Sequence, residues 1–138
     1  MPPNKNKIMG KVSKSGTNFG VDLFFLKNEA IEVEWVPGGC LMHHKNNLYL
    51  RDYYPFKGKA YYEDLIHSKI LIQKNIKLSI IKDAICKTDF PIFPKKFKEF
   101  IRYIKAYSYC SKIYDVGIIR KYICMTLYLA RYIKNRLL

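Results

Sequence analysis

The sequence is poor in acidic residues: 11 Asp and Glu stand against 25 Lys and Arg, which gives a net charge of +14. This balance excludes an acidic surface and favours anionic partners, such as nucleic acid, phospholipid headgroups or phosphorylated small molecules. The sequence also lacks any block of five or more like charges, whereas a nucleic-acid-binding arm usually concentrates its charge. We therefore expect a generally basic surface, with nucleic acid as a less favoured partner.

No C-x-x-C pair occurs among the four cysteines, and residues 1–14 are polar and basic without the apolar core of a secretory signal. Both absences favour a reduced, cytoplasmic setting. Cys and His are zinc ligands, but the spacing of Cys40, His43, His44 and His67 matches no standard zinc pattern. Buried thiols and surface imidazoles are the favoured interpretation of these residues.

Long hydrophobic runs are also missing. The longest uncharged run near the C-terminus covers residues 122–130, far short of the roughly 20 residues that span a bilayer. Basic residues on both sides, such as Arg120 and Arg131, would suit a helix lying among anionic headgroups at the inner face of a membrane. A terminal helix packed on the domain explains the same pattern equally well. Peripheral membrane contact therefore stays one of two open expectations.

The residues that are present predict a folded chain. Hydrophobic residues make up 49% and aromatic residues 15% of the 138 positions, which is not a disordered composition and suffices for one domain or part of one. Hydrophobic periodicity predicts an α/β architecture, with a flexible lead-in or loop over 1–20 and amphipathic helices over 93–138. Strands are expected at 21–26, 31–36 and 77–81, and helices at 61–74, 94–109 and 115–136, with a further short helix within 40–50.

The chain is organised around residues 58–68, where Glu63 and Asp64 precede an apolar helical run. This places both carboxylates in the first turn of a helix, where unpaired N–H groups and the helix dipole favour the ionised form. A carboxylate held in this way can take a proton from a substrate hydroxyl within hydrogen-bond reach. The alternative, an acidic pair that only stabilises its helix, is favoured by the sequence physics alone, since acidic first turns are common.

Gly38 and Gly39 follow Pro37 at the end of a predicted strand. Two glycines permit positive φ angles and let a ligand or another segment approach the backbone closely. A simple turn is an equally good explanation of the pair.

Three segments, taken in order and spacing, resemble the second half of a family 2 glycosyltransferase. The resemblance is good from about residue 20 to 90 and looser afterwards. The segments are Asp22-Leu23-Phe24-Phe25-Leu26, Trp35-Val36-Pro37-Gly38-Gly39-Cys40, and the run from Asp52 through Glu63-Asp64 to Ser68.

This resemblance implies part of a GT-A fold, with a short mixed sheet, and inverting transfer of a sugar from a nucleotide-diphosphate sugar to a carbohydrate or lipid-linked acceptor. Residues 21–92 would form the acceptor-side part of the catalytic domain. Asp64 matches the catalytic base of the family, and Glu63 would help hold the acceptor or a loop. Gly38 and Gly39 match the loop beside the donor sugar and acceptor.

The sequence also departs from the family pattern. The family holds a divalent metal, Mn or Mg, on an Asp-x-Asp motif in an N-terminal nucleotide-binding half, and no Asp-x-Asp occurs here. Glu32-x-Glu34 is the only similar spacing and fits strand alternation. A Gly-rich phosphate loop, the downstream metal-binding His and the Gln-x-x-Arg-Trp motif are also missing. The chain therefore resembles an acceptor-side half without a donor-side half, so we predict no transfer by the chain alone.

An incomplete fold implies a partner. Strands that would belong to a larger sheet leave an unpaired edge and apolar surface, which predicts self-association or a donor-half partner chain. Two alternatives from other classes remain: a small basic nucleic-acid-binding protein whose Tyr and Phe stack on bases, and a membrane-surface protein acting through its last helix.

Overall fold

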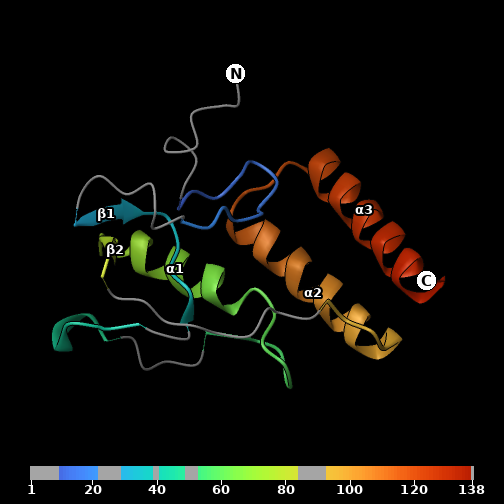
Figure 1. Ribbon diagram of the computed structural model, residues 1–138, viewed down its shortest axis with the longest axis horizontal. Coiled ribbons are helices and arrows are strands. Elements are labelled where there is room, and N and C mark those ends of the chain that lie inside the picture. Colours follow the sequence, from blue (N-terminus) through green and yellow to red (C-terminus); the bar gives the residue numbers. More distant parts are fainter. Residues whose placement is uncertain (1–9, 22–28, 39–40, 49–52, 84–92, 138) are drawn as a thin grey trace.

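The computed structural model describes residues 10–21, 29–38, 41–48, 53–83 and 93–137. Within these ranges the chain is a mixed α/β structure with a two-stranded antiparallel sheet and three α-helices (Figure 1). The elements in order are β1 (Ala30–Val33), the short 3₁₀ helix η4 (Lys45–Asn47), α1 (Glu63–Gln73), β2 (Leu78–Ile81), α2 (Phe97–Ile113) and α3 (Ile118–Leu137).

The two strands pair so that Val33 lies opposite Leu78 and Ala30 opposite Ile81. Val33 and Leu78 are buried and form a small core with Val36 and Leu71. The predicted strand 77–81 is confirmed as β2, and the strand predicted over 31–36 is found one residue earlier and ends at Val33. The pairing in the described residues is purely antiparallel, so the expected mixed sheet is not found there, and the expected strand at 21–26 lies outside the described residues beyond Val21.

Helix α1 occupies the centre of the molecule, between the sheet and α2 (Figure 1). It packs on one side against β2 and on another against α2, because buried residues are spread around its axis rather than along one stripe. These residues are Leu65, Ile66, His67, Ser68 and Leu71. The predicted helix over 61–74 is therefore confirmed, but its apolar face is broader than the sequence pattern indicated.

Helices α2 and α3 run antiparallel and side by side, with α3 outermost (Figure 1). The connection between them is short and contains Asp115 in a left-handed conformation, with φ of 51°. Helix α2 continues one turn beyond the predicted end at residue 109, because Cys110 and Ile113 pack against Leu65 and Ile66 of α1. The predicted pair of C-terminal helices is thus confirmed with shifted bounds.

Residues 10–19 form a hairpin-like loop that rests on the sheet. Gly10 and Phe19 pair through their backbones, Val12 bridges Asn18, and the Glu34 N–H donates to the Gly10 carbonyl. Gly10 has φ of +63°, and a Cβ there would collide with Val33, so only glycine fits this crossing. Of the two expectations for residues 1–20, a flexible lead-in or a loop, the described part from Gly10 onward is a loop, and its packing on the sheet was not predicted.

The predicted short helix within residues 40–50 is reduced to η4. The His44 Nδ1 accepts a hydrogen bond from the Asn46 N–H at 3.3 Å, which caps this single turn. The described part of the segment otherwise has no helical structure. A capping bond of this kind favours a local turn over a continued helix.

Candidate functional site

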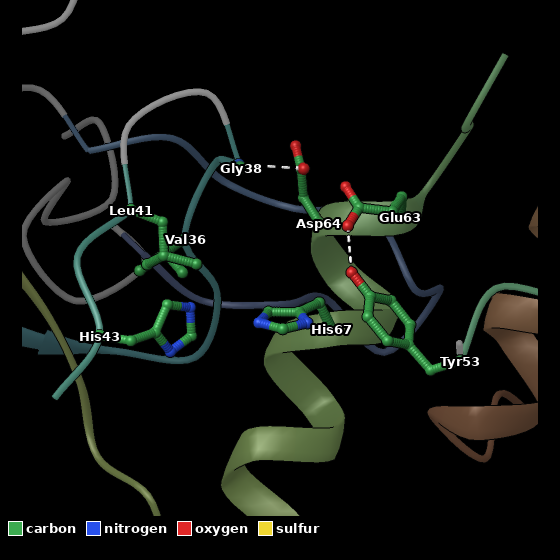
Figure 2. Close-up of a pocket in the computed structure, with 8 residues that line it drawn as sticks. All are labelled: Val36, Gly38, Leu41, His43, Tyr53, Glu63, Asp64 and His67. Atoms are coloured by element: carbon green, nitrogen blue, oxygen red, sulfur yellow. Dashed lines mark hydrogen bonds between the residues drawn. The ribbon is translucent and has the colours of Figure 1, made fainter. Parts of the chain in front are cut away.

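A cavity of about 290 Å³ lies beside the first turn of α1 (Figure 2). Four parts of the chain meet there: the loop after β1, the segment before η4, the aromatic segment before α1, and α1 itself. The lining residues are Val36, Gly38, Leu41, His43, Tyr53, Glu63, Asp64 and His67. The structure thus brings together three of the four residues that the sequence singled out, Gly38, Glu63 and Asp64. Gly39 lies outside the described residues.

The loop after β1 closes on the carboxylate of Asp64. The Gly38 N–H donates a hydrogen bond to Asp64 Oδ1 at 3.0 Å. A Cβ at Gly38 would lie 2.7 Å from Asp64 Oδ1 and 3.3 Å from Glu63 Oε2, so a larger residue cannot occupy this position without displacing the carboxylates. The close approach predicted for the glycine pair is therefore real at Gly38, and the segment that approaches is the start of α1.

Asp64 is a stronger base than an ordinary aspartate. Desolvation by burial raises its pKa to about 6, with the hydrogen bond and the charge of Glu63 acting in the same direction and the Gly38 N–H opposing them. The sequence analysis expected the first helical turn to favour the ionised form. Both carboxylates do lie in the first turn of α1, but at Asp64 burial and a neighbouring carboxylate act against the helix terminus and raise the pKa.

Glu63 is tied to the wall of the cavity. The Tyr53 hydroxyl donates a short hydrogen bond to Glu63 Oε1, drawn in Figure 2. The Tyr53 ring also lies 4.9 Å from the His67 ring, centroid to centroid. The hydrogen bond from Tyr53 therefore fixes the orientation of the Glu63 carboxylate, which lies next to Asp64.

Tyr62 sets the direction in which α1 begins. It has φ of 60°, a left-handed conformation that is uncommon for a bulky residue, and its side chain makes no capping bond to the helix. Its hydroxyl instead lies 2.7 Å from the Tyr103 hydroxyl of α2 and 3.1 Å from the Tyr128 hydroxyl of α3. The two C-terminal helices thus hold the residue that precedes Glu63 and Asp64. Sequence reasoning missed this role, for which the abundance of tyrosine was the available signal.

The sequence analysis considered His67 only as a conceivable zinc ligand and missed its place in this cavity, although its position four residues after Glu63 puts both on one face of α1. Its side chain is 9% exposed, so the prediction of surface imidazoles is wrong for this residue. Among the described residues neither ring nitrogen finds a hydrogen-bond partner. Burial lowers the pKa of His67, as does the nearby His43 ring, so the imidazole is neutral at pH 7 and presents one donor and one acceptor to the cavity.

The structure does not gather the four residues considered as zinc ligands into one described site. His43 and His67 approach edge to face with centroids 5.4 Å apart, while His44 caps η4 and Cys40 lies outside the described residues. In the described ranges no group of three or more His, Cys, Asp or Glu side chains is arranged to hold a metal ion. Mn and Mg prefer several oxygen ligands, so the residues seen here do not fit the metal of the resembled family.

Comparison with known proteins gives no match: no protein-family model, curated protein sequence or solved structure matches this chain. The chemistry of the cavity must therefore be argued from its own geometry.

Proposed function

We propose that this chain is the acceptor-side part of an inverting family 2 glycosyltransferase of the GT-A type, with Asp64 as the general base. Asp64 takes the proton of an acceptor hydroxyl as that oxygen forms a bond to the anomeric carbon of the donor sugar. The bond from that carbon to the diphosphate breaks, and a nucleoside diphosphate leaves. Donor binding is assigned to a half that residues 1–138 do not supply, and no step here is assigned to a metal ion.

The placement of the Asp64 carboxylate, in the lining of a cavity and against the Gly38 N–H, is the observation that carries this proposal. A general base works best when its pKa lies near the working pH, and the pKa of Asp64 is raised to about 6. The carboxylate lines a cavity, so a hydroxyl can reach it. An acidic pair that only stabilised its helix would gain from full ionisation and exposure to water. The desolvation of Asp64 is therefore a cost that a helix-capping role does not explain.

The remaining lining residues suit a hydroxyl-bearing ligand. The neutral imidazole of His67 can both donate to and accept from a sugar hydroxyl, and Val36 and Leu41 supply an apolar wall for the sugar's C–H groups. The cavity, at about 290 Å³, is at the lower end of ligand-pocket volumes. It suits a single sugar-sized group rather than a whole nucleotide sugar.

The nucleic-acid alternative is weaker. Base stacking requires exposed aromatic faces, and among the tyrosines in the described ranges only Tyr122 is mostly exposed, at 59%. Several of the others pack between helices, as Tyr103 and Tyr107 do against Tyr128. The exposed phenylalanines Phe97 and Phe19 lie far apart in the sequence, at 60% and 40% exposure. The basic charge alone then gives only weak, sequence-independent attraction to phosphate.

A nuclear magnetic resonance titration of the isotopically labelled chain tests the proposal. Methyl glycosides of common hexoses serve as acceptor probes, and UDP-, GDP- and dTDP-sugars with manganese serve as donor probes. We expect at least one glycoside to shift the resonances of Gly38, Tyr53 and His67, and the nucleotide sugars to leave them unchanged. Asp64→Asn should weaken the glycoside-induced shifts, while Asp83→Asn, which removes an exposed carboxylate beyond β2, should not.

Two outcomes would contradict the proposal. Nucleotide-sugar binding would mean that the chain contains a donor site, which removes the argument for a missing half. The absence of any glycoside effect on a folded chain, or effects confined to residues away from the cavity, would remove the argument for an acceptor site at Asp64.

A further inference from the structure

Helix α3 turns its aliphatic face away from the protein. Eight large apolar side chains of this helix are between 45% and 81% exposed, and at about 100° per residue they fall on one half of the helix, opposite Tyr128 and Lys121. They are Ile118, Ile119, Tyr122, Ile123, Leu127, Leu129, Ile133 and Leu137. An amphipathic helix packed on a domain normally buries its apolar stripe and exposes its polar one. Helix α3 does the opposite, because its aliphatic side chains are exposed.

Tyrosines occupy the packed side of α3 instead. Tyr132 stacks on Phe100 of α2 with ring centroids 4.4 Å apart, and Tyr128 meets Tyr103 and Tyr107 edge to face at 5.2 Å. These contacts anchor α3 without using its aliphatic residues. The exposed face, here named the α3 outer face and made of the eight residues given above, is therefore left without a partner among the described residues.

The charges on α3 are all of one sign. The helix carries Arg120, Lys121, Arg131, Lys134 and Arg136 and no acidic residue. With about 100° between successive residues, Arg120 and Lys134 lie along one margin of the α3 outer face and Arg136 lies at the other. An apolar stripe bordered by cations fits a boundary between hydrocarbon and negative charge.

We propose that α3 docks flat on an anionic lipid bilayer, with its outer face among the acyl chains and its marginal Arg and Lys at the phosphates. None of the described helices is long and apolar enough to cross a membrane, so the contact proposed is peripheral. This inference does not depend on the transferase proposal, since no lining residue of the Asp64 cavity belongs to α3.

The charge pattern argues against the other occupants. Two copies of α3 packed face to face would bring ten cations together with no acidic partner on either helix, which opposes a dimer through this face. Nucleic acid would pair with the cations, but Ile and Leu side chains offer no stacking surface for bases. An anionic lipid surface offers acyl chains to the aliphatic side chains and phosphates to the cations at the same time.

Vesicle co-sedimentation tests the docking directly. Phosphatidylcholine vesicles are compared with vesicles containing one third phosphatidylglycerol, and we expect binding only to the second kind, weakening steeply with salt. Ile119→Ser with Ile123→Ser should abolish binding. The matched control, Met42→Ser with Ile81→Ser, changes two other exposed apolar residues, 95% and 56% exposed, and should bind as the parent does.

A charge variant and an optical probe sharpen the test. Arg120→Gln with Lys134→Gln should weaken binding on the order of 30-fold, from two cations near the lipid surface, whereas Lys45→Gln with Lys57→Gln should have little effect. In a Tyr122→Trp variant, the added fluorescence should shift to the blue on binding and be quenched by brominated acyl chains.

Each contrary result overturns the proposal. Equal binding to neutral vesicles would remove the role of the cations. Binding that survives both Ile119→Ser and Ile123→Ser would place the contact elsewhere. Sedimentation velocity showing a dimer that depends on Ile119 and Ile123, without lipid binding, would assign the α3 outer face to a second copy, and no binding of any kind would leave no lipid contact.

Discussion

The backbone N–H of Gly38 and the carboxylate of Asp64, 26 residues apart in the sequence, meet at 3.0 Å. This contact joins the loop after β1 to the first turn of α1 and forms one edge of the cavity (Figure 2). Any substitution other than proline leaves the backbone N–H in place, but a larger side chain fills the space around it. The contact therefore gives a direct way to disturb Asp64 without altering its chemistry.

We expect Gly38→Ala to destabilise the chain by about 1–3 kcal/mol, the usual cost of forcing an atom into a packed site. The new Cβ would lie 2.7 Å from Asp64 Oδ1, so the carboxylate has to move. Urea unfolding measures the change. Gly20→Ala is the matched control, because a Cβ there meets nothing within 4 Å. Equal stability of the two variants would mean that the loop relaxes freely away from Asp64.

The pKa of Asp64 predicts how stability depends on pH. Because its folded-state pKa, about 6, lies above the ordinary value of 3.8, the protonated form favours folding, and this contribution is lost as the pH rises through 6. Asp64→Asn should therefore be more stable than the parent at pH 7.5, by about 1 kcal/mol after allowance for partial solvent screening. The difference should shrink toward pH 4. Thermal unfolding at several pH values measures it.

The control for this series is Asp83→Asn, which should show no such dependence on pH. If Asp64→Asn were less stable than the parent at pH 7.5, the ionised carboxylate would be contributing to stability. The carboxylate would then be acting as a helix-stabilising anion, and its desolvation would no longer support a role as a base.

His67 should respond to pH in the opposite sense. Its pKa is lowered, first by burial and then by His43, so the neutral form favours folding and its contribution is lost as the pH falls below the ordinary value of 6.5. Replacing the buried imidazole with an apolar ring removes two nitrogens that find no hydrogen-bond partner among the described residues, each costly to bury. His67→Phe should therefore equal or exceed the parent in stability, by about 1 kcal/mol at pH 7, and gain further relative to it at pH 5.

The readout for His67→Phe has two parts. Thermal unfolding gives the stability, and the glycoside titration gives the function, which the variant should lose because the hydroxyl partner is gone. His43→Phe is a useful comparison, since His43 lines the same cavity but is not one of the buried side chains. A large loss of stability in His67→Phe would show that the imidazole nitrogens have partners in the folded chain.

The elements of this structure were largely predictable, because each carries its own local signal. The acidic start and apolar run of α1, and the alternation of β1 around Glu32, are patterns within a few residues. The contacts that set the pKa and the backbone conformation at the site were not predictable, because they join residues far apart in the sequence. The raised pKa of Asp64 comes from burial under a loop 26 residues away, and the left-handed Tyr62 is held by hydroxyls 41 and 66 residues further along. Such contacts exist only after the chain has folded.

The same limit applies to the exposed aliphatic face of α3. Periodicity shows that a helix has an apolar side, but it does not show which side meets the protein. The number of tyrosines in α2 and α3 was the only sequence signal, since Tyr103, Tyr107 and Tyr128 can pack against one another as an alternative to aliphatic contacts.

The contact between Tyr62 and Tyr128 links α3 to the cavity and supplies the last prediction. The two hydroxyls lie 3.1 Å apart, and Tyr62 immediately precedes Glu63. Tyr128→Phe keeps the ring packing but removes this hydrogen bond, so we expect a loss of about 1 kcal/mol in unfolding free energy. Because Tyr62 holds the start of α1, the variant should also shift the resonances of Asp64 and of Gly38, which contacts it. Tyr122→Phe, which changes an exposed tyrosine on the same helix, should do neither. A destabilised Tyr128→Phe variant with unchanged cavity resonances would mean that α3 supports the fold without positioning the site.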